Sequence, residues 1–126
     1  MKEEIKKAID TIKKGGIILY PTDTIWGIGC DSKNKDAIAK IFSIKKRHNN
    51  KALISLVSDK DMINKYTDAN QLKIKKFNQP TTIVYQNVSN LANNLIAEDN
   101  TAAFRITNDK FCNLLISSFG YPIVST

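Results

Sequence analysis

Three groups of residues in this sequence have the chemistry to bind a small anionic ligand. Thr22-Asp23-Thr24 places two hydroxyls and a carboxylate directly after the apolar segment 17–20. The segment 44–51, IKKRHNNK, contains three lysines, one arginine and one histidine. Arg105 stands alone in the apolar run 102–106. Hydroxyls can hold carboxylates and phosphates, arginine binds them with a planar fork, and lysine binds them as a mobile point charge.

Each group also has an ordinary structural interpretation. Asp and Thr in a turn often bond to their own backbone, and cations at a helix C-terminus complement the helix dipole. A buried arginine needs a partner, whereas one on an edge faces solvent. We favour phosphate binding for 44–51, because five cationic or potentially cationic groups in seven residues exceed what capping requires. The alternatives stay open for Thr22–Thr24 and for Arg105.

The periodicity of apolar residues predicts the elements that position these groups. We expect a mixed α/β or α+β sheet with helices packed on it, because helices and strands interleave without a strict βαβ repeat. Thr22–Thr24 would then follow a strand that Pro21 ends, at the strand end where ligands bind in α/β sheets. The expected helices are 3–14, 34–46, 59–66, 68–77 and 109–119, and the expected strands are 17–20, 52–57, 81–85, 102–106 and 122–126, with a loop at 86–94.

Length and composition fit a single globular domain over residues 1–126. No apolar run approaches the roughly 18 to 20 residues of a membrane span, and the charged N-terminus is unlike a signal peptide, so we expect a cytoplasmic protein. Cys30 and Cys112 have no metal-like spacing and are expected to be reduced. The net charge of +7 suits a polyanion such as a nucleotide or RNA, although a lysine-rich solvated surface would give the same value.

Several standard motifs are absent from the sequence. It has no GxxxxGK[ST] loop, no GxGxxG and no GxSxG. His48 has no second metal ligand nearby, so we predict no metal site in the protein itself. Cys30 is interpreted as a small core residue, and Trp26 as part of the core or of a pocket wall. The remaining candidates are therefore the hydroxyl and cationic groups described above.

The order of these segments resembles the YrdC-like family of threonylcarbamoyl-adenylate synthases. The family's PTDT hallmark matches PTDTIWGIGCD at 21–31, and its Lys-x-Arg motif matches Lys45-Lys46-Arg47. A short basic loop with Lys51 then leads into the strand ALISLV. Weaker matches are NQPTTIVY at 78–85, the Thr101–Arg105 pair of a T-x-x-x-R strand, and PIVST at 122–126. The resemblance implies the YrdC/RibB-type fold, an α/β (α+β) mixed twisted sheet with packed helices.

The resemblance also implies an activity, that of a nucleotidyltransferase. Such an enzyme condenses L-threonine, bicarbonate and ATP, with Mg²⁺ expected alongside ATP, into threonylcarbamoyl-AMP and pyrophosphate. Partner proteins then transfer the threonylcarbamoyl group to tRNA, forming threonylcarbamoyladenosine. By resemblance, threonine would be bound by Thr24, Arg105 and Ser125. Catalysis would rest on Lys45 and Arg47, and ATP would be bound by Lys45, Arg47, Lys51 and Thr101.

The resemblance ends at Thr126, where the family's Ser-x-Asn motif would begin. We therefore expect the domain to lack the family's C-terminal portion, and the strand 122–126 to lie at an unpaired sheet edge. One alternative function is a non-catalytic protein of this fold that binds double-stranded RNA or tRNA through a basic surface. Another is a piece of a larger carbamoyl-transferring maturation factor, which would carry further domains.

Overall fold

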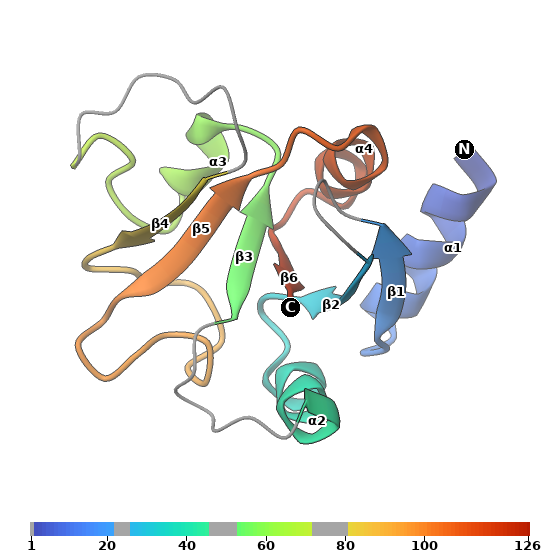
Figure 1. Ribbon diagram of the computed structural model, residues 1–126, viewed down its shortest axis with the longest axis horizontal. Helices are drawn as coiled ribbons and strands as arrows, with labels where there is room; N and C mark the ends of the chain where they lie inside the picture. Colours follow the sequence, from blue (N-terminus) through green and yellow to red (C-terminus); the bar gives the residue numbers. More distant parts are fainter. Residues whose placement is uncertain (1, 22–25, 46–52, 72–80) are drawn as a thin grey trace.

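A computed structural model describes residues 2–21, 26–45, 53–71 and 81–126 of the chain. In these residues a six-stranded mixed sheet runs in the order β1-β2-β6-β3-β5-β4, with four helices packed around it (Figure 1). Only β3 and β5 pair in parallel among the described strands. The helices are α1 (Lys2–Lys13), α2 (Lys35–Lys45), α3 (Lys60–Ile63) and α4 (Lys110–Phe119), and the strands are β1 (Ile18–Pro21), β2 (Trp26–Asp31), β3 (Ile54–Val57), β4 (Thr82–Tyr85), β5 (Ala102–Ile106) and β6 (Ile123–Ser125).

The predicted mixed sheet is confirmed, and most predicted elements form within a few residues of their expected positions. Asp59 and Asp109 cap α3 and α4 by accepting hydrogen bonds from the backbone three residues on. Gly120 ends α4 with φ of 89°, a left-handed conformation that favours glycine. The predicted helix 68–77 is wrong over 68–71, which form a turn, and 72–80 lie outside the described residues.

Two features of the sheet differ from expectation. The glycine-containing segment 26–31 was not predicted as a strand, yet it forms β2 and pairs with both β1 and β6. The expectation of an unpaired edge at 122–126 is wrong, because β6 pairs with β2 on one side and β3 on the other. Pro21 is the last residue of β1, as predicted, and pairs with Trp26 of β2.

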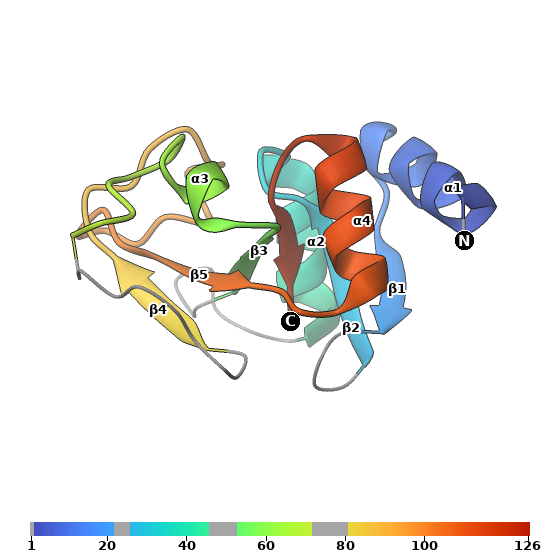
Figure 2. The same ribbon diagram turned by 90° about the horizontal axis from the view of Figure 1, so that it is seen from above.

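Helices cover the two faces of the sheet over different strands. Tyr20, Leu56 and Ile123 lie against Cys112, Leu115 and Ile116 of α4, so α4 covers one face around β6. The opposite face carries the buried side chains of Cys30, Phe104 and Val124. Figure 2 shows α2 on the far side of the sheet from α4, and no helix of the described residues in front of β4 and β5 on the α4 side. Tyr66, which follows α3, contacts the Phe104 ring on the opposite face. No helix in the described part of the chain is long and apolar enough to cross a membrane.

Candidate functional site

Arg105 is the predicted site residue that the structure describes most fully. It lies near the carboxyl end of β5 and is paired in register with Thr82 of β4. Its Nε and Nη2 donate hydrogen bonds to Thr82 Oγ1 at 3.0 and 2.8 Å. Phe104 is buried in the core and Ile106 packs against it, so Arg105 points to the other face of the sheet, as strand alternation predicts.

The face that carries Arg105 is open over β4 and β5. Thr82 is exposed, and Val84, two residues along the same strand, is 57% exposed. Arg105 is itself half-buried and lies in register with Leu56, which α4 covers. The guanidinium therefore stands at the border between the covered and the open part of one face, where a ligand can reach it.

Ser125 lies on the same face as Arg105 but not beside it. Its neighbour in register on β3 is Ile54, whereas the neighbour of Arg105 on β3 is Leu56. The two residues are thus two strands and two positions apart, which places their Cα atoms roughly 12 Å from each other. Ser125 is 9% exposed. The structure therefore brings the two predicted threonine-binding residues to one face of the sheet, with β3 between their strands.

Thr101 lies before the other end of β5. Four residues of extended chain separate it from Arg105, a span of roughly 13 Å. Its hydroxyl donates to Asp99 Oδ1 at 2.6 Å, and its backbone N–H donates to the same oxygen at 3.2 Å. These bonds lower the pKa of the Asp99 carboxyl. The Thr101 hydroxyl thus has a local structural role in the turn, as Asp and Thr commonly do.

The remaining predicted site residues lie outside what the structure describes. Lys45 is the last residue of α2, which confirms that the basic segment follows a helix end, but its side chain is not described. Thr24, Arg47 and Lys51 fall in the ranges 22–25 and 46–52, outside the described residues. The expected cationic face beside Thr22–Thr24 therefore stays a prediction.

Nucleophilic and metal-binding chemistry finds little support among the described residues. Within them, no three His, Cys, Asp or Glu side chains come together in a way that could hold a metal ion. Cys30 and Cys112 are buried free thiols. Burial, followed by the nearby Asp31 carboxylate, raises the pKa of Cys30 to about 12, so its thiol stays protonated and unreactive at neutral pH.

Lys33 forms a structural cluster next to the end of β2. Its Nζ pairs with Asp31 Oδ1 at 2.9 Å and lies 3.6 Å from the ring centroid of Tyr121 and 5.1 Å from that of Phe119. The lysine thus joins the end of β2 to the segment after α4 through an ion pair and cation–π contacts. Since its ammonium group contacts Asp31 and two aromatic rings of the protein itself, we assign Lys33 a structural role.

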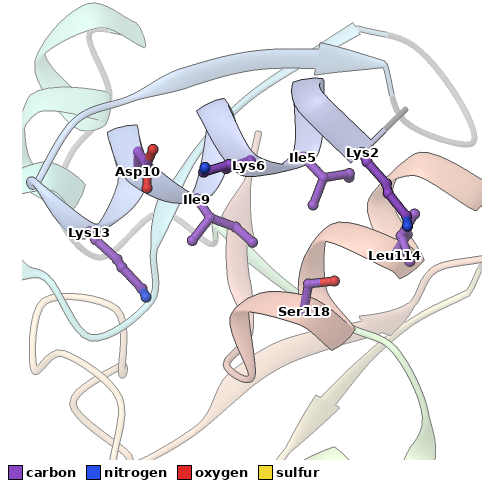
Figure 3. A pocket seen from close by; sticks show the side chains of 8 residues that line it. All are labelled: Lys2, Ile5, Lys6, Ile9, Asp10, Lys13, Leu114 and Ser118. Atoms are coloured by element: carbon purple, nitrogen blue, oxygen red, sulfur yellow. The ribbon is translucent and has the colours of Figure 1, made fainter.

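An open groove of about 460 Å³ runs between α1 and α4 (Figure 3). Its apolar lining comes from Ile5, Ile9 and Leu114, and Lys2, Lys6 and Lys13 line it as well. None of the site residues predicted from the sequence lines it. The groove is therefore separate from the candidate site around Arg105.

Thr82 is the functional candidate that the sequence analysis missed. It lies in the segment NQPTTIVY, which carried part of the family resemblance, but nothing in that segment indicates a contact with a residue 23 positions later. The contact depends on the register of β4 against β5. Pairing register across a long connection cannot be read from one sequence, so only the structure could reveal it.

The fold and the site together define a mixed α/β domain with an arginine presented on a partly open sheet face. A family model described as "Telomere recombination", for the Sua5, YciO and YrdC proteins, matches residues 10–126. The chain belongs to this family. Its similarity to the family covers the six described strands, α2, α3, α4 and the last turn of α1.

Curated relatives and solved structures agree with this assignment. The chain is 32% identical to the threonylcarbamoyl-AMP synthase of Pseudoalteromonas translucida, over 97% of this chain and 69% of that protein, and 33% identical to that of Hydrogenovibrio crunogenus, over 97% and 70%. It superposes on E. coli YciO with a TM-score of 0.86 at 24% identity, and on P. abyssi Sua5 in complex with L-threonine with 0.87 at 21%. The whole chain is covered in both, but it spans only 64% and 38% of those structures.

Proposed function

We propose that this chain synthesises L-threonylcarbamoyladenylate. This is the reaction after which its curated relatives are named. The observation that carries the proposal is Arg105, a cation placed on an open sheet face and held by a neutral hydroxyl. The similarity across 97% of the chain to threonylcarbamoyl-AMP synthases supports the same conclusion. So does the likeness of its fold to a Sua5 structure that contains L-threonine.

The proposed reaction needs no nucleophilic side chain. The amine of L-threonine attacks carbon dioxide or bicarbonate to form a carbamate, and bicarbonate loses its third oxygen as water. A carbamate oxygen then attacks the α-phosphorus of ATP, and pyrophosphate leaves. Such a reaction is accelerated by holding the reactants together and by neutralising phosphate charge. A site built from hydroxyls and cations matches that requirement.

The proposed roles are those that the family resemblance implies for these residues. Arg105 would bind the threonine carboxylate, because a guanidinium takes a carboxylate with two parallel hydrogen bonds. Ser125, on the same face, would contact the other end of the amino acid, together with Thr24. Lys45, Arg47 and Lys51 would bind the ATP phosphates, with Lys45 and Arg47 stabilising the reacting phosphate, and Thr101 would lie near the nucleotide. Mg²⁺ would arrive with ATP, since it is commonly held by substrate phosphates.

The test is product formation by the purified chain. L-Threonine, bicarbonate and ATP are supplied together, and threonylcarbamoyl-AMP is detected by mass spectrometry alongside released pyrophosphate. We expect both products to require all three substrates and to fall at least tenfold in Arg105→Ala. Pyrophosphate release that ignores threonine would contradict the proposal. Transfer to tRNA by partner proteins would be the step that follows.

A second candidate function is binding of tRNA or double-stranded RNA without catalysis. The net charge of +7 favours it, because RNA binding relies on cations that contact phosphates. A chain that binds RNA tightly but forms no threonylcarbamoyl-AMP would support this function over synthesis.

A further inference from the structure

The hydrogen bonds between Thr82 and Arg105 have an unusual combination of partners. Both Nε and Nη2 of the guanidinium donate to one hydroxyl oxygen, across a register pair of adjacent strands. An arginine on a strand usually gains more from a carboxylate, which supplies charge as well as acceptors. Thr82 supplies the acceptor alone. The contact with Thr82 therefore orients the guanidinium through hydrogen bonds to an uncharged acceptor.

Threonine is well suited to orient a long side chain. Its β-branched side chain is stiff at χ1, so the hydroxyl is a fixed point on β4. Arginine, in contrast, has many rotamers and loses side-chain entropy when it is immobilised. Bonds to Nε and Nη2 fix the plane of the guanidinium relative to the sheet. Part of the entropy cost of ordering Arg105 is thereby met before a ligand arrives.

We propose that Thr82 is a positioning residue that holds Arg105 ready for the carboxylate of an amino-acid substrate. This proposal rests on the proposed function for the identity of the ligand. Thr82 thus acts on the ligand through Arg105.

The test compares variants that remove or keep the hydroxyl. Thr82→Val retains the shape of the side chain but cannot accept a hydrogen bond, whereas Thr82→Ser retains the hydroxyl. Thr67→Val is the matched control, because it removes a threonine hydroxyl that bonds instead to the Gln86 carbonyl oxygen. L-Threonine binding is measured by calorimetry, with ATP binding and thermal unfolding measured in parallel.

We expect Thr82→Val to weaken L-threonine binding about three- to tenfold, the effect of one hydrogen bond. Thr82→Ser and Thr67→Val should bind L-threonine like the wild type, and no variant should change ATP affinity. In an Arg105→Ala background, Thr82→Val should have no further effect on L-threonine binding. An equal loss of L-threonine and ATP binding in Thr82→Val would indicate a purely structural role and overturn the proposal.

A second measurement separates this proposal from the proposed function. The Nε–H of Arg105 is followed by ¹⁵N NMR, and its exchange with water should speed up in Thr82→Val but not in Thr82→Ser. If the wild type binds no L-threonine while this exchange still depends on Thr82, the positioning role stands and the proposed substrate is wrong. Unchanged exchange in Thr82→Val overturns the positioning role, whatever the ligand.

Discussion

The ring of Tyr20 lies across Gly29. It occupies the space that the side chain of any other residue at position 29 would need. A Cβ atom added to Gly29 would overlap the Tyr20 ring and lie 2.7 Å from the carbonyl oxygen of Val124. The Tyr20 hydroxyl donates to that same carbonyl oxygen at 3.3 Å. One tyrosine thus covers a glycine on β2 and reaches β6, so it connects three strands.

We predict that Gly29→Ala destabilises the fold by about 1 to 3 kcal/mol, the usual cost of overpacking a core. The ring of Tyr20 can shift, but the Val124 carbonyl belongs to the β6 backbone and cannot. Urea denaturation measures the loss. Tyr20→Phe is the control for the hydroxyl alone and should cost only about 0.5 to 1.5 kcal/mol. Gly29→Ala with wild-type stability would show that the contact is not restrictive.

Arg105→Lys is predicted to separate threonine binding from ATP binding. Lysine keeps the positive charge but cannot reproduce the two-pronged contact of a guanidinium with a carboxylate. A charge-assisted hydrogen bond of this kind contributes roughly 1.5 to 3 kcal/mol, so L-threonine affinity should fall by about one to two decades. The measurement is a threonine titration at saturating ATP. If ATP binding is lost and threonine binding is kept, Arg105 belongs to the phosphate site.

The basic segment after α2 leads to a prediction about RNA. If it contacts RNA phosphates, affinity should fall steeply with salt concentration, because each contact releases counterions. Replacing Lys45, Lys46 and Arg47 with Gln should reduce the slope of log affinity against log salt by roughly two to three. Filter binding over a salt series provides the slope. The same slope in the triple variant would assign RNA binding to another surface.

Alkaline pH is predicted to destabilise the protein through Cys30. The unfolded thiol loses its proton near its ordinary pKa of 9.0, whereas the buried thiol keeps it up to about 12. The unfolded state therefore binds fewer protons in this window, and the free energy of unfolding falls as the pH rises from about 9 to 12. One such group gives a slope of about 1.4 kcal/mol per pH unit.

Cys30→Ala tests this assignment by removing the titrating group. It should lower stability at neutral pH, because it leaves a small cavity, but it should flatten the decline above pH 9. Tyr66, whose pKa burial raises to about 12, contributes in the same direction above its ordinary value of 10.0 and stays in the variant. A decline of unchanged steepness would exclude Cys30 as its main source.

Local signals in the sequence predicted most of the helices and strands, because each depends on neighbouring residues. The apolar spacing of α1, the Asp109 cap and the Gly120 stop of α4 are examples. β2 was missed because glycine is rare in strands. What makes Gly29 acceptable there is Tyr20, nine residues earlier, and a contact across strands is invisible in a local pattern.

The candidate site could likewise be predicted only where local sequence signals determine it. Alternation along β5 correctly placed Arg105 on the face opposite Phe104. Its partner Thr82 could not be predicted, because their contact is set by how β4 pairs with β5. The distance between Arg105 and Ser125 depends likewise on the insertion of β3 between their strands. The sequence was sufficient to predict which single residues could bind a ligand. It was not sufficient to predict contacts that depend on how two strands pair.

The position of β6 constrains when this chain can fold. β6 spans residues 123–125 and follows the other described strands in sequence, yet it lies between β2 and β3 and separates the pair β1–β2 from the group β3-β5-β4. A chain still being synthesised has to hold these two parts with open edges until residue 125 has left the ribosome. Such late pairing between residues far apart in sequence slows folding. While they wait, the edges of β2 and β3 can pair with other chains, so the interval before β6 inserts is when aggregation competes most strongly with folding.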